Sequence, residues 1–372
     1  MTKDFIKRYM ITLETEGPLF IGSGKELTKK EWIYDRKKKK GIILDERKLF
    51  DYLSQKKLID SFESFMLDSR SRTQLYDWMT EHGVYPSDAG KIKKYEADCR
   101  GLQNVKRDVA IQLFIKDGYG YPYIPGSSLK GALRNVILAE MIRKNPCDNS
   151  SIVKNASNPK GQNRKQFMRR ESVSLNQTYF NKRKLTGKKS DMVNDIMSGI
   201  RISDSDPLDV SCLTICQKVD TLIDGGDNSL NIVRECIRPG TKIKMQMNVD
   251  TTCLKVSPEY IQRAVNNFLK EYNDLFLSHF REEKQYRSDI IYLGGGTGYH
   301  TKTVTNRILA DRKDRTQLTS QIIDSTLSRK IQREHKHSRD KTLGVSPHTV
   351  KCTEYDGYLQ QMGPCRISID KF

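Results

Sequence analysis

The sequence predicts an α+β fold in which antiparallel strands alternate with amphipathic helices. Apolar side chains occupy every second position at Tyr9, Ile11 and Leu13, which is the spacing of a half-buried strand. Residues 261–276 instead carry apolar side chains at helical spacing, and Ser257-Pro258 before them supplies an N-cap and a first-turn proline. Both patterns occur in each half of the chain, so we expect helices on one face of a sheet in each half.

The other expected elements follow from the same two spacings. In the first half we expect a hairpin over 32–44, two helices over 46–80, a strand over 109–115 and a helix up to 141 with Ser127 or Ser128 as its N-cap. In the second half we expect strands near 210–216, 232–233, 243–249, 290–293 and 366–369. This order of elements predicts a tandem pair of ferredoxin-like, or RNA-recognition-like, domains.

The basic residues are unevenly distributed along the chain. More than half of the net charge of +19 lies between residues 142 and 201, a stretch punctuated by Pro and Gly and without sustained apolar periodicity. We therefore expect an N-terminal domain over 1–145 with a helical insertion near 46–100, a basic linker or insertion over 146–205, and a C-terminal domain over 206–372.

The charge indicates a polyanionic partner, with nucleic acid first and an anionic membrane surface second. Tyr179 and Phe180 precede the basic run Lys182, Arg183 and Lys184. Aromatic rings can stack on bases while cations follow the phosphates, so we take this run as a candidate RNA contact. The alternative is a solvated surface without a ligand.

The cellular location is predicted from two features. No apolar run approaches the roughly 20 residues of a membrane span, and the N-terminus does not have the pattern of a signal peptide. The 8 Cys are scattered singly, which indicates reduced thiols. We therefore expect a cytoplasmic protein, and the sequence indicates no cofactor.

The most distinctive segment runs from Pro125 to Arg134. Gly126, Ser127 and Ser128 open the expected helix, where free backbone N–H groups and the positive helix end suit a phosphate. Lys130 and Arg134 are four residues apart and share a helix face. The alternative is a capped structural helix. Ser127 and Lys130 also match S-x-x-K, but its partner motifs do not occur in the sequence.

Two further segments are rich in glycine. The run from Leu293 to Gly298 matches neither the dinucleotide-binding nor the P-loop pattern. It predicts a flexible backbone that can approach a ligand, and a shorter version follows the first strand. The candidate RNA contacts of these segments are Gly22, Ser23, Gly24, Gly294, Gly295, Gly296, Thr297, His300 and Lys302.

Metal and acid–base chemistry have little support in the sequence. Cys212 and Cys216 are expected on one face of a strand, which favours core packing over zinc binding. His335 and His337 have a suitable spacing for a metal, but they lie in a basic run that repels cations. We therefore predict no metal site. His300 is the one histidine placed like a general acid or base.

The glycine-rich segments together resemble a known family. The opening strand ending at Gly22–Gly24, the segment Ile124–Arg134 and the late loop Leu293–Gly298 occur in the order found in the RAMP superfamily of CRISPR proteins. Within it the chain most resembles the family of the fifth subunit of the type III-A (Csm) effector complex. The resemblance spans nearly the whole chain, apart from the basic stretch over 142–201.

The resemblance implies a non-catalytic RNA-binding subunit that caps a filament of backbone subunits. It implies binding of the 3′ part of the crRNA, support of crRNA 3′-end maturation by host nucleases, and contact with target RNA and with backbone and small subunits. One alternative is a metal-independent endoribonuclease acting on repeat RNA, with His300 as acid or base and Lys302 holding the phosphate. Another is a protein that binds DNA or a membrane surface.

Overall fold

Two β-sheets form the frame of this computed structural model, which describes residues 5–35, 37–71, 73–84, 89–102, 109–158, 163–281, 283–309 and 311–371. Parts of the expected segments 46–100 and 146–205 lie outside these ranges. The smaller sheet has five strands, in the order β11 (Ile290–Tyr292), β14 (Pro364–Lys371), β1 (Ile6–Thr15), β10 (Lys242–Asp250) and β7 (Ile200–Ile202).

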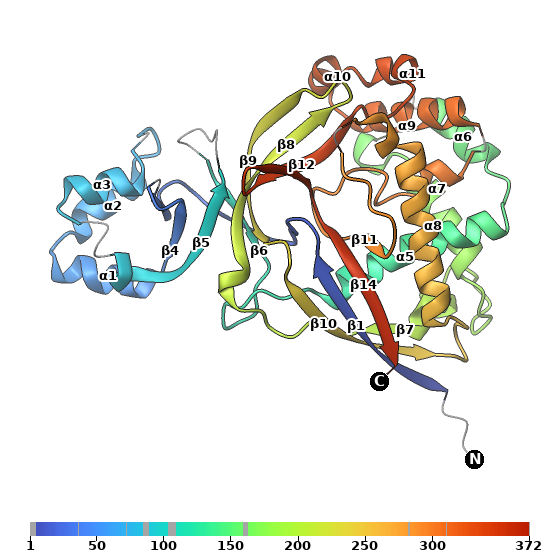
Figure 1. The fold of residues 1–372 in the computed structure, drawn as a ribbon, viewed down its shortest axis with the longest axis horizontal. Helices are drawn as coiled ribbons and strands as arrows, with labels where there is room; N and C mark the ends of the chain where they lie inside the picture. The colour runs from blue at the N-terminus through green and yellow to red at the C-terminus, as the bar shows by residue number, and fades with distance from the viewer. Residues whose placement is uncertain are drawn as a thin grey trace.

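The first strand of the chain lies in the middle of this smaller sheet. β1 pairs antiparallel with β10, where Ile11 faces Met245, and with β14, where Ile11 faces Ile369. Figure 1 shows the beginning of β1 beside the end of β14. Ile11 is fully buried, as the alternation in the sequence predicts. Strands that are far apart in the sequence therefore lie side by side at the centre of the smaller sheet.

The larger sheet has nine strands and is mixed. Its main path is β2 (Gly22–Leu27), β6 (Ile111–Phe114), β9 (Asp227–Ile237), β8 (Leu213–Leu222), β5 (Lys93–Gly101), β4 (Lys40–Leu44) and β3 (Trp32–Asp35). β12 (Thr349–Tyr355) also pairs with β8 and forms a hairpin with β13 (Tyr358–Gln361). The β5–β8 and β6–β9 pairs are parallel.

Both sheets take strands from both halves of the chain. The predicted boundaries at 145 and 206 therefore do not coincide with the sheets, and a division into separate domains stays a prediction. The predicted α+β class is confirmed: helices and mixed sheets are layered against one another (Figure 1). The reason for the interleaving is that β1 finds its partners more than 200 residues away, in β10 and β14.

Three helices build a lobe that projects from β4 and β5, at the left of Figure 1. The helices are α1 (Glu46–Gln55), α2 (Ile59–Leu67) and α3 (Leu75–Glu81), followed by the short α4 (Ala89–Ile92). Leu53, Leu75 and Trp78 lie in an apolar core of the lobe that is distinct from the main core. Two helices were predicted over 46–80, and this was wrong, because the segment forms the three helices α1, α2 and α3. The backbone of Asp68 is off helical geometry and ends α2 before α3 begins.

The remaining helices pack on the other side of the sheets (Figure 1). α5 and α8 contact each other and the smaller sheet, and Ser257 caps α8 as predicted, accepting a hydrogen bond from the Tyr260 N–H. The bounds of these helices are α5 (Gly126–Lys144), α6 (Ser150–Ser157), α7 (Arg169–Phe180), α8 (Pro258–Leu275), α9 (Arg312–Thr326), α10 (Arg329–His335) and α11 (Asp340–Leu343).

The basic stretch over 146–205 is folded onto the body in its described part. α6, α7 and β7 lie in it, and Leu175, Tyr179 and Phe180 of α7 are buried in the main core. The rings of Tyr179 and Phe180 were expected to be available for stacking on bases, but both are buried and have no free face. The apolar positions of α7 were too few to show a helical period in the sequence.

Several local predictions need correction. α5 begins at Gly126 with Pro125 as its N-cap, so Ser127 and Ser128 lie in the first turn. Gly22 to Gly24 do not form a loop; they begin β2, where Gly22 pairs with Phe114. β8 starts at Leu213, after a short turn of 3-10 helix. β5 and the β12–β13 hairpin were missed.

Two observations relate to the predicted cytoplasmic location: the state of the cysteines and the character of the helices. All eight Cys thiols are free. Among the described residues, no helix combines the length and the apolar character that a membrane span requires.

Candidate nucleic-acid interface

The late glycine loop is fixed by backbone hydrogen bonds to two distant segments. The Leu293 N–H donates to the Gly363 carbonyl at 2.8 Å, and the Gly363 N–H donates to the Pro18 carbonyl at 2.9 Å. The Gly295 N–H donates to the Phe20 carbonyl at 2.6 Å. Three chain segments thus meet where the two sheets adjoin, so the loop is rigid rather than flexible as its composition suggested.

Glycine is required in this loop by close approach. Gly294 has φ +80°, and a Cβ there would lie 2.2 Å from the Phe20 carbonyl oxygen. Gly296 has φ +81°, and a Cβ there would lie 2.5 Å from Nη1 of Arg234. Both positions combine left-handed backbone with no room for a side chain. The glycines therefore allow the loop to lie directly on Phe20 and Arg234.

Arg234 is the central cation of this region. Its guanidinium lies 5.1 Å from the centroid of the Phe20 ring, and its Nε donates to Oε1 of Gln112 at 3.2 Å. Its Nη1 is buried and has no acceptor among the described residues. Burial lowers the pKa of Arg234, and the charges of Cys236 and Asp220 partly offset this. A buried guanidinium donor without an acceptor is costly, and the side chain as a whole is only partly buried, so an anion at the surface would stabilise its charge.

Three lysines extend the positive charge around Arg234. Burial, and then the charge of Lys351, lower the pKa of Lys218. Desolvation by the surrounding protein lowers the pKa of Lys302, and the charge of Arg234 lowers it further, although part of the side chain is exposed. Asp220 accepts from Lys351 at 2.7 Å and lies 3.3 Å from Lys218. We call Lys218, Arg234, Lys302 and Lys351 the cationic group.

The charge of the cationic group is only partly compensated. Asp220 is the one carboxylate that pairs with any of its four members among the described residues. Like charges that are held together and partly desolvated gain strongly from binding an anion. Phosphates of a nucleic acid release condensed counterions on binding and satisfy several cations at once. The arrangement is suited to a phosphodiester backbone lying over the glycine loop.

At the start of α5, the other predicted phosphate site, carboxylates of the same chain already accept from the available donors. The Gly126 N–H donates to Oδ1 of Asp204 at 2.8 Å. Arg134 forms an ion pair with Asp195 at 2.7 Å, donates to Asn176 at 3.0 Å and lies over the Phe180 ring. Burial lowers the pKa of Lys130, while the charge of Asp195 raises it. This is the geometry of the capped structural helix.

The structure brings some of the candidate residues together and leaves others apart. Gly22 lies next to the Phe20 ring, so the early and late glycine segments share Phe20. Asn135 of α5 donates to the Lys302 carbonyl at 2.9 Å, which joins α5 to the end of the glycine segment. Ser23 is used within the sheet, donating to the Leu113 carbonyl.

The basic run at the end of α7 belongs to a different neighbourhood. The Arg183 N–H donates to the Asn194 carbonyl, and its guanidinium donates to Ser198 at 3.2 Å. Lys182 and Lys184 are exposed. These contacts place the run beside the turn that carries Asp195 rather than beside the glycine loop.

His300 is enclosed rather than presented at the surface. Its side chain is 6% exposed, its Nε2 donates to the Ser346 carbonyl at 2.6 Å, and it packs on the Phe276 ring. Burial lowers its pKa to about 4. Thr297 is also buried, hydrogen-bonded to Thr301. A neutral, enclosed imidazole cannot reach a ribose or a phosphate, so this placement argues against His300 as a general acid or base.

Lys218, Arg234 and Lys351 were not singled out from the sequence. A signal existed for Arg234, because it interrupts the apolar run around Val233 and Ile237 of a predicted strand. Lys218 lies at a bulge in β8, where the register against β9 shifts, so strand alternation could not place it. Lys351 lies in β12, which was not predicted.

Comparison with known proteins defines the class of this fold and site. Residues 12–315 match the family model of the RAMP superfamily. The chain is 28% identical to the CRISPR system Cms protein Csm5 of Mycobacterium tuberculosis strain H37Rv, over 98% of both chains. It is 30% identical to the protein of that name from Streptococcus thermophilus, over 81% of both chains. The chain therefore belongs to the RAMP superfamily and, within it, to the Csm5 family.

Solved structures share the fold. A chain in the cryo-EM structure of a Csm–crRNA–target RNA ternary complex of a type III-A CRISPR-Cas system superimposes with a TM-score of 0.65 at 19% identity, covering 97% of this chain and 100% of that one. The crystal structure of T. onnurineus Csm5 gives a TM-score of 0.62 at 19% identity, covering 95% and 99%. The resemblance to this family predicted from the glycine-rich segments is confirmed.

Proposed function

We propose that this chain is a non-catalytic, RNA-binding subunit of a type III-A CRISPR (Csm) complex. In this role it binds the 3′ part of the crRNA, caps the filament of backbone subunits, and supports 3′-end maturation of the crRNA by host nucleases. Its partners are crRNA, the backbone and small subunits and, during interference, target RNA. The complex acts in the cytoplasm.

The observation that carries the proposal is the cationic group on the glycine loop. Lys218 and Lys351 share Asp220, whereas Arg234 and Lys302 pair with no carboxylate among the described residues. Membership of the Csm5 family, and the similarity in fold to a chain of a Csm–crRNA–target RNA complex, support RNA as the polyanion. A sequence-independent contact with phosphates fits a guide RNA whose spacer sequence varies.

Binding of single-stranded RNA at different salt concentrations tests the proposal. Fluorescence anisotropy of a labelled RNA carrying the 3′ part of a crRNA would give Kd for the full chain and for the double variant Arg234→Gln, Lys302→Gln. We expect roughly tenfold weaker binding for the variant. The slope of log K against log salt should fall by about 1.4, since each lost phosphate contact contributes about 0.7 on single strands.

The matched control is Lys270→Gln. Lys270 is an exposed cation of α8 that pairs with Asp274, so its loss should leave Kd and the salt slope unchanged. Equal Kd and slope for the wild type and the double variant, with folding intact, would contradict the proposal. Neutralising Lys182, Arg183 and Lys184 together tests the second predicted contact, and an unchanged slope there would make that run a solvated surface.

The assembly role needs a separate experiment. The chain would be co-expressed with the backbone subunits and a crRNA, and the mass of the complexes measured by mass photometry. We expect one copy per complex, located at one filament end. Incorporation at several positions along the filament would contradict the capping role while leaving RNA binding intact.

A further inference from the structure

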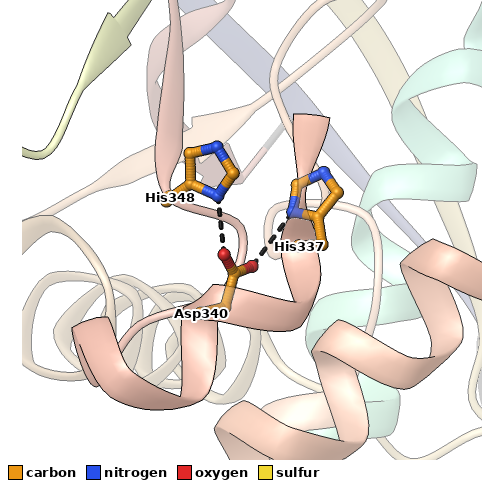
Figure 2. A group of neighbouring side chains, drawn as sticks. All are labelled: His337, Asp340 and His348. Atoms are coloured by element: carbon orange, nitrogen blue, oxygen red, sulfur yellow. Dashed lines mark hydrogen bonds and ion pairs between the residues drawn. The ribbon is translucent and has the colours of Figure 1, made fainter. Parts of the chain in front are cut away.

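Two buried histidines converge on one carboxylate near the C-terminus. Nδ1 of His337 lies 3.0 Å from Oδ2 of Asp340, and Nδ1 of His348 lies 2.6 Å from Oδ1 of the same side chain. Figure 2 shows both imidazole rings directed toward Asp340 from opposite sides of the turn. One potential ligand atom from each residue lies within 4.8 Å of the others. We call these three residues the His–Asp–His cluster.

The cluster joins a helical segment to the larger sheet. His337 follows α10, Asp340 is the first residue of α11, and His348 directly precedes β12. The turn is anchored on α9, where Ser320 donates to the His337 carbonyl at 2.7 Å. All three side chains are largely shielded, with Asp340 fully buried. The positions are thus fixed by contacts that do not depend on the cluster itself.

The Asp340 carboxylate is bonded to two imidazoles and has no Lys or Arg partner among the described residues. A buried carboxylate without a permanent counter-charge is costly, so a cation is favoured there.

A second buried carboxylate oxygen lies on α9, the helix that also anchors the turn through Ser320. Oδ1 of Asp324 is buried and has no hydrogen-bond partner among the described residues. The charges of His337, Asp340 and His348 all act on Asp324, which places it near the cluster but not among its converging ligand atoms. The basic neighbours in the sequence do not compensate, because Lys336, Arg339 and Lys341 are exposed. The run of positive charge therefore lies outside the cluster.

We propose that His337, Asp340 and His348 bind a divalent transition-metal ion, with Zn²⁺ as the best fit. Imidazole nitrogen and carboxylate oxygen are its common ligands, at about 2.0 to 2.2 Å. Each histidine would bind through Nδ1, so a neutral ring moves its proton from Nδ1, where it is donated to Asp340, to Nε2, and the number of protons on the ring stays the same. Water completes the tetrahedral set.

The metal has a structural role in this position. It joins the segment over 329–343 to the start of β12, three residues before Lys351 of the cationic group. Chelation should therefore loosen α10 and α11 and leave the two sheets intact. No activity follows from the site, because its ligands are shielded from solvent.

Metal content and cobalt spectroscopy test the proposal on the full chain. The protein would be dialysed against a chelator, then titrated with Co²⁺ and followed by its visible d–d absorption, with Zn²⁺ added as competitor. We expect saturation at one metal ion per chain, intense tetrahedral bands, displacement by Zn²⁺, and a rise of several degrees in Tm with Zn²⁺. A wild-type chain that binds less than a stoichiometric amount and shows no rise in Tm would overturn the proposal.

Variants locate the metal within the chain. Asp340→Asn and His348→Gln should abolish the cobalt bands. His335→Gln is the matched control, because His335 stacks on His337 without bonding to Asp340 and is exposed. If Asp340→Asn keeps the bands at full intensity, the site is refuted. Should a variant fail to fold, the wild-type stoichiometry and the His335→Gln protein still decide the outcome.

Discussion

The glycine loop and the start of α5 both combine glycine with a nearby lysine in the sequence and an arginine in the fold, but they differ in how their charges are neutralised. At the start of α5 the helix N–H of Gly126 is bound by Asp204, and Arg134 is bound by Asp195. Beside the glycine loop, Arg234 keeps a buried donor without an acceptor among the described residues. The donors of the first region are taken by carboxylates of the same chain, whereas the second region keeps an unpaired donor and is the one that we propose as an RNA contact.

The comparison shows that a basic glycine motif alone does not define an anion site. What distinguishes the two regions is whether carboxylates of the same chain have already taken the donors. Asp195 and Asp204 are far from α5 in sequence, so this difference is visible only in the folded chain. The three predictions below test the comparison, from the largest expected effect to the smallest.

Gly294→Ala should disrupt the glycine loop most strongly. The added Cβ would lie 2.2 Å from the Phe20 carbonyl oxygen at a residue with φ +80°. We expect a loss of about 4 kcal/mol in the free energy of unfolding, from backbone strain and overpacking together, measured by urea denaturation. Gly225→Ala is the control: its φ is +87° with open space around it, so strain alone should cost about 1 kcal/mol. Equal losses would show that the loop is loosely packed.

His300 should make the glycine-loop region sensitive to acid. Its folded pKa is about 4, below the ordinary value of 6.5, so the unfolded chain binds the proton first. The stabilisation is complete above about pH 6.5 and is lost as the pH falls toward 4. Between pH 7 and pH 5 we expect a loss of about 2 kcal/mol that is missing in His300→Gln. Identical pH profiles for the two proteins would mean that His300 is accessible to water.

Arg134→Ala should weaken folding and leave RNA binding unchanged. The variant loses the ion pair with Asp195, the hydrogen bond to Asn176 and the contact with the Phe180 ring. We expect a loss of about 1.5 kcal/mol in unfolding free energy, because the pair is partly exposed to solvent. The Kd for single-stranded RNA should stay within error of the wild type. A weaker Kd in a stable variant would remove the distinction between the two regions.

The sequence predicted those elements whose signal is local. β1, β10 and α8 have unbroken apolar periods, and Ser257-Pro258 marks the start of α8 at the correct residue. β5 was missed although Tyr95, Ala97 and Cys99 alternate with charged residues, because it lies in the stretch expected to be a helical insertion near 46–100. The sheet order could not be predicted, because the partners of β1 are set by packing between the two ends of the chain.

The candidate site was predicted in part for the same reason. Gly294, Gly296 and Lys302 were identified from a short motif. Lys218, Arg234 and Lys351 come from three different strands, and only the pairing of β8 with β9 and β12 brings them together. The His–Asp–His cluster likewise needs a turn that places His348 against Asp340, which spacing along the chain does not reveal.

The position of β1 between β10 and β14 sets an order of events during synthesis. The ribosome makes β1 well before its neighbours on either side, which lie more than 200 residues further along the chain. Contacts of such long sequence separation form late and slowly. β1 therefore stays unpaired and half apolar until β10 has been made, and its pairing with β14 follows more than 100 residues later, so the smaller sheet assembles from its centre only late in synthesis.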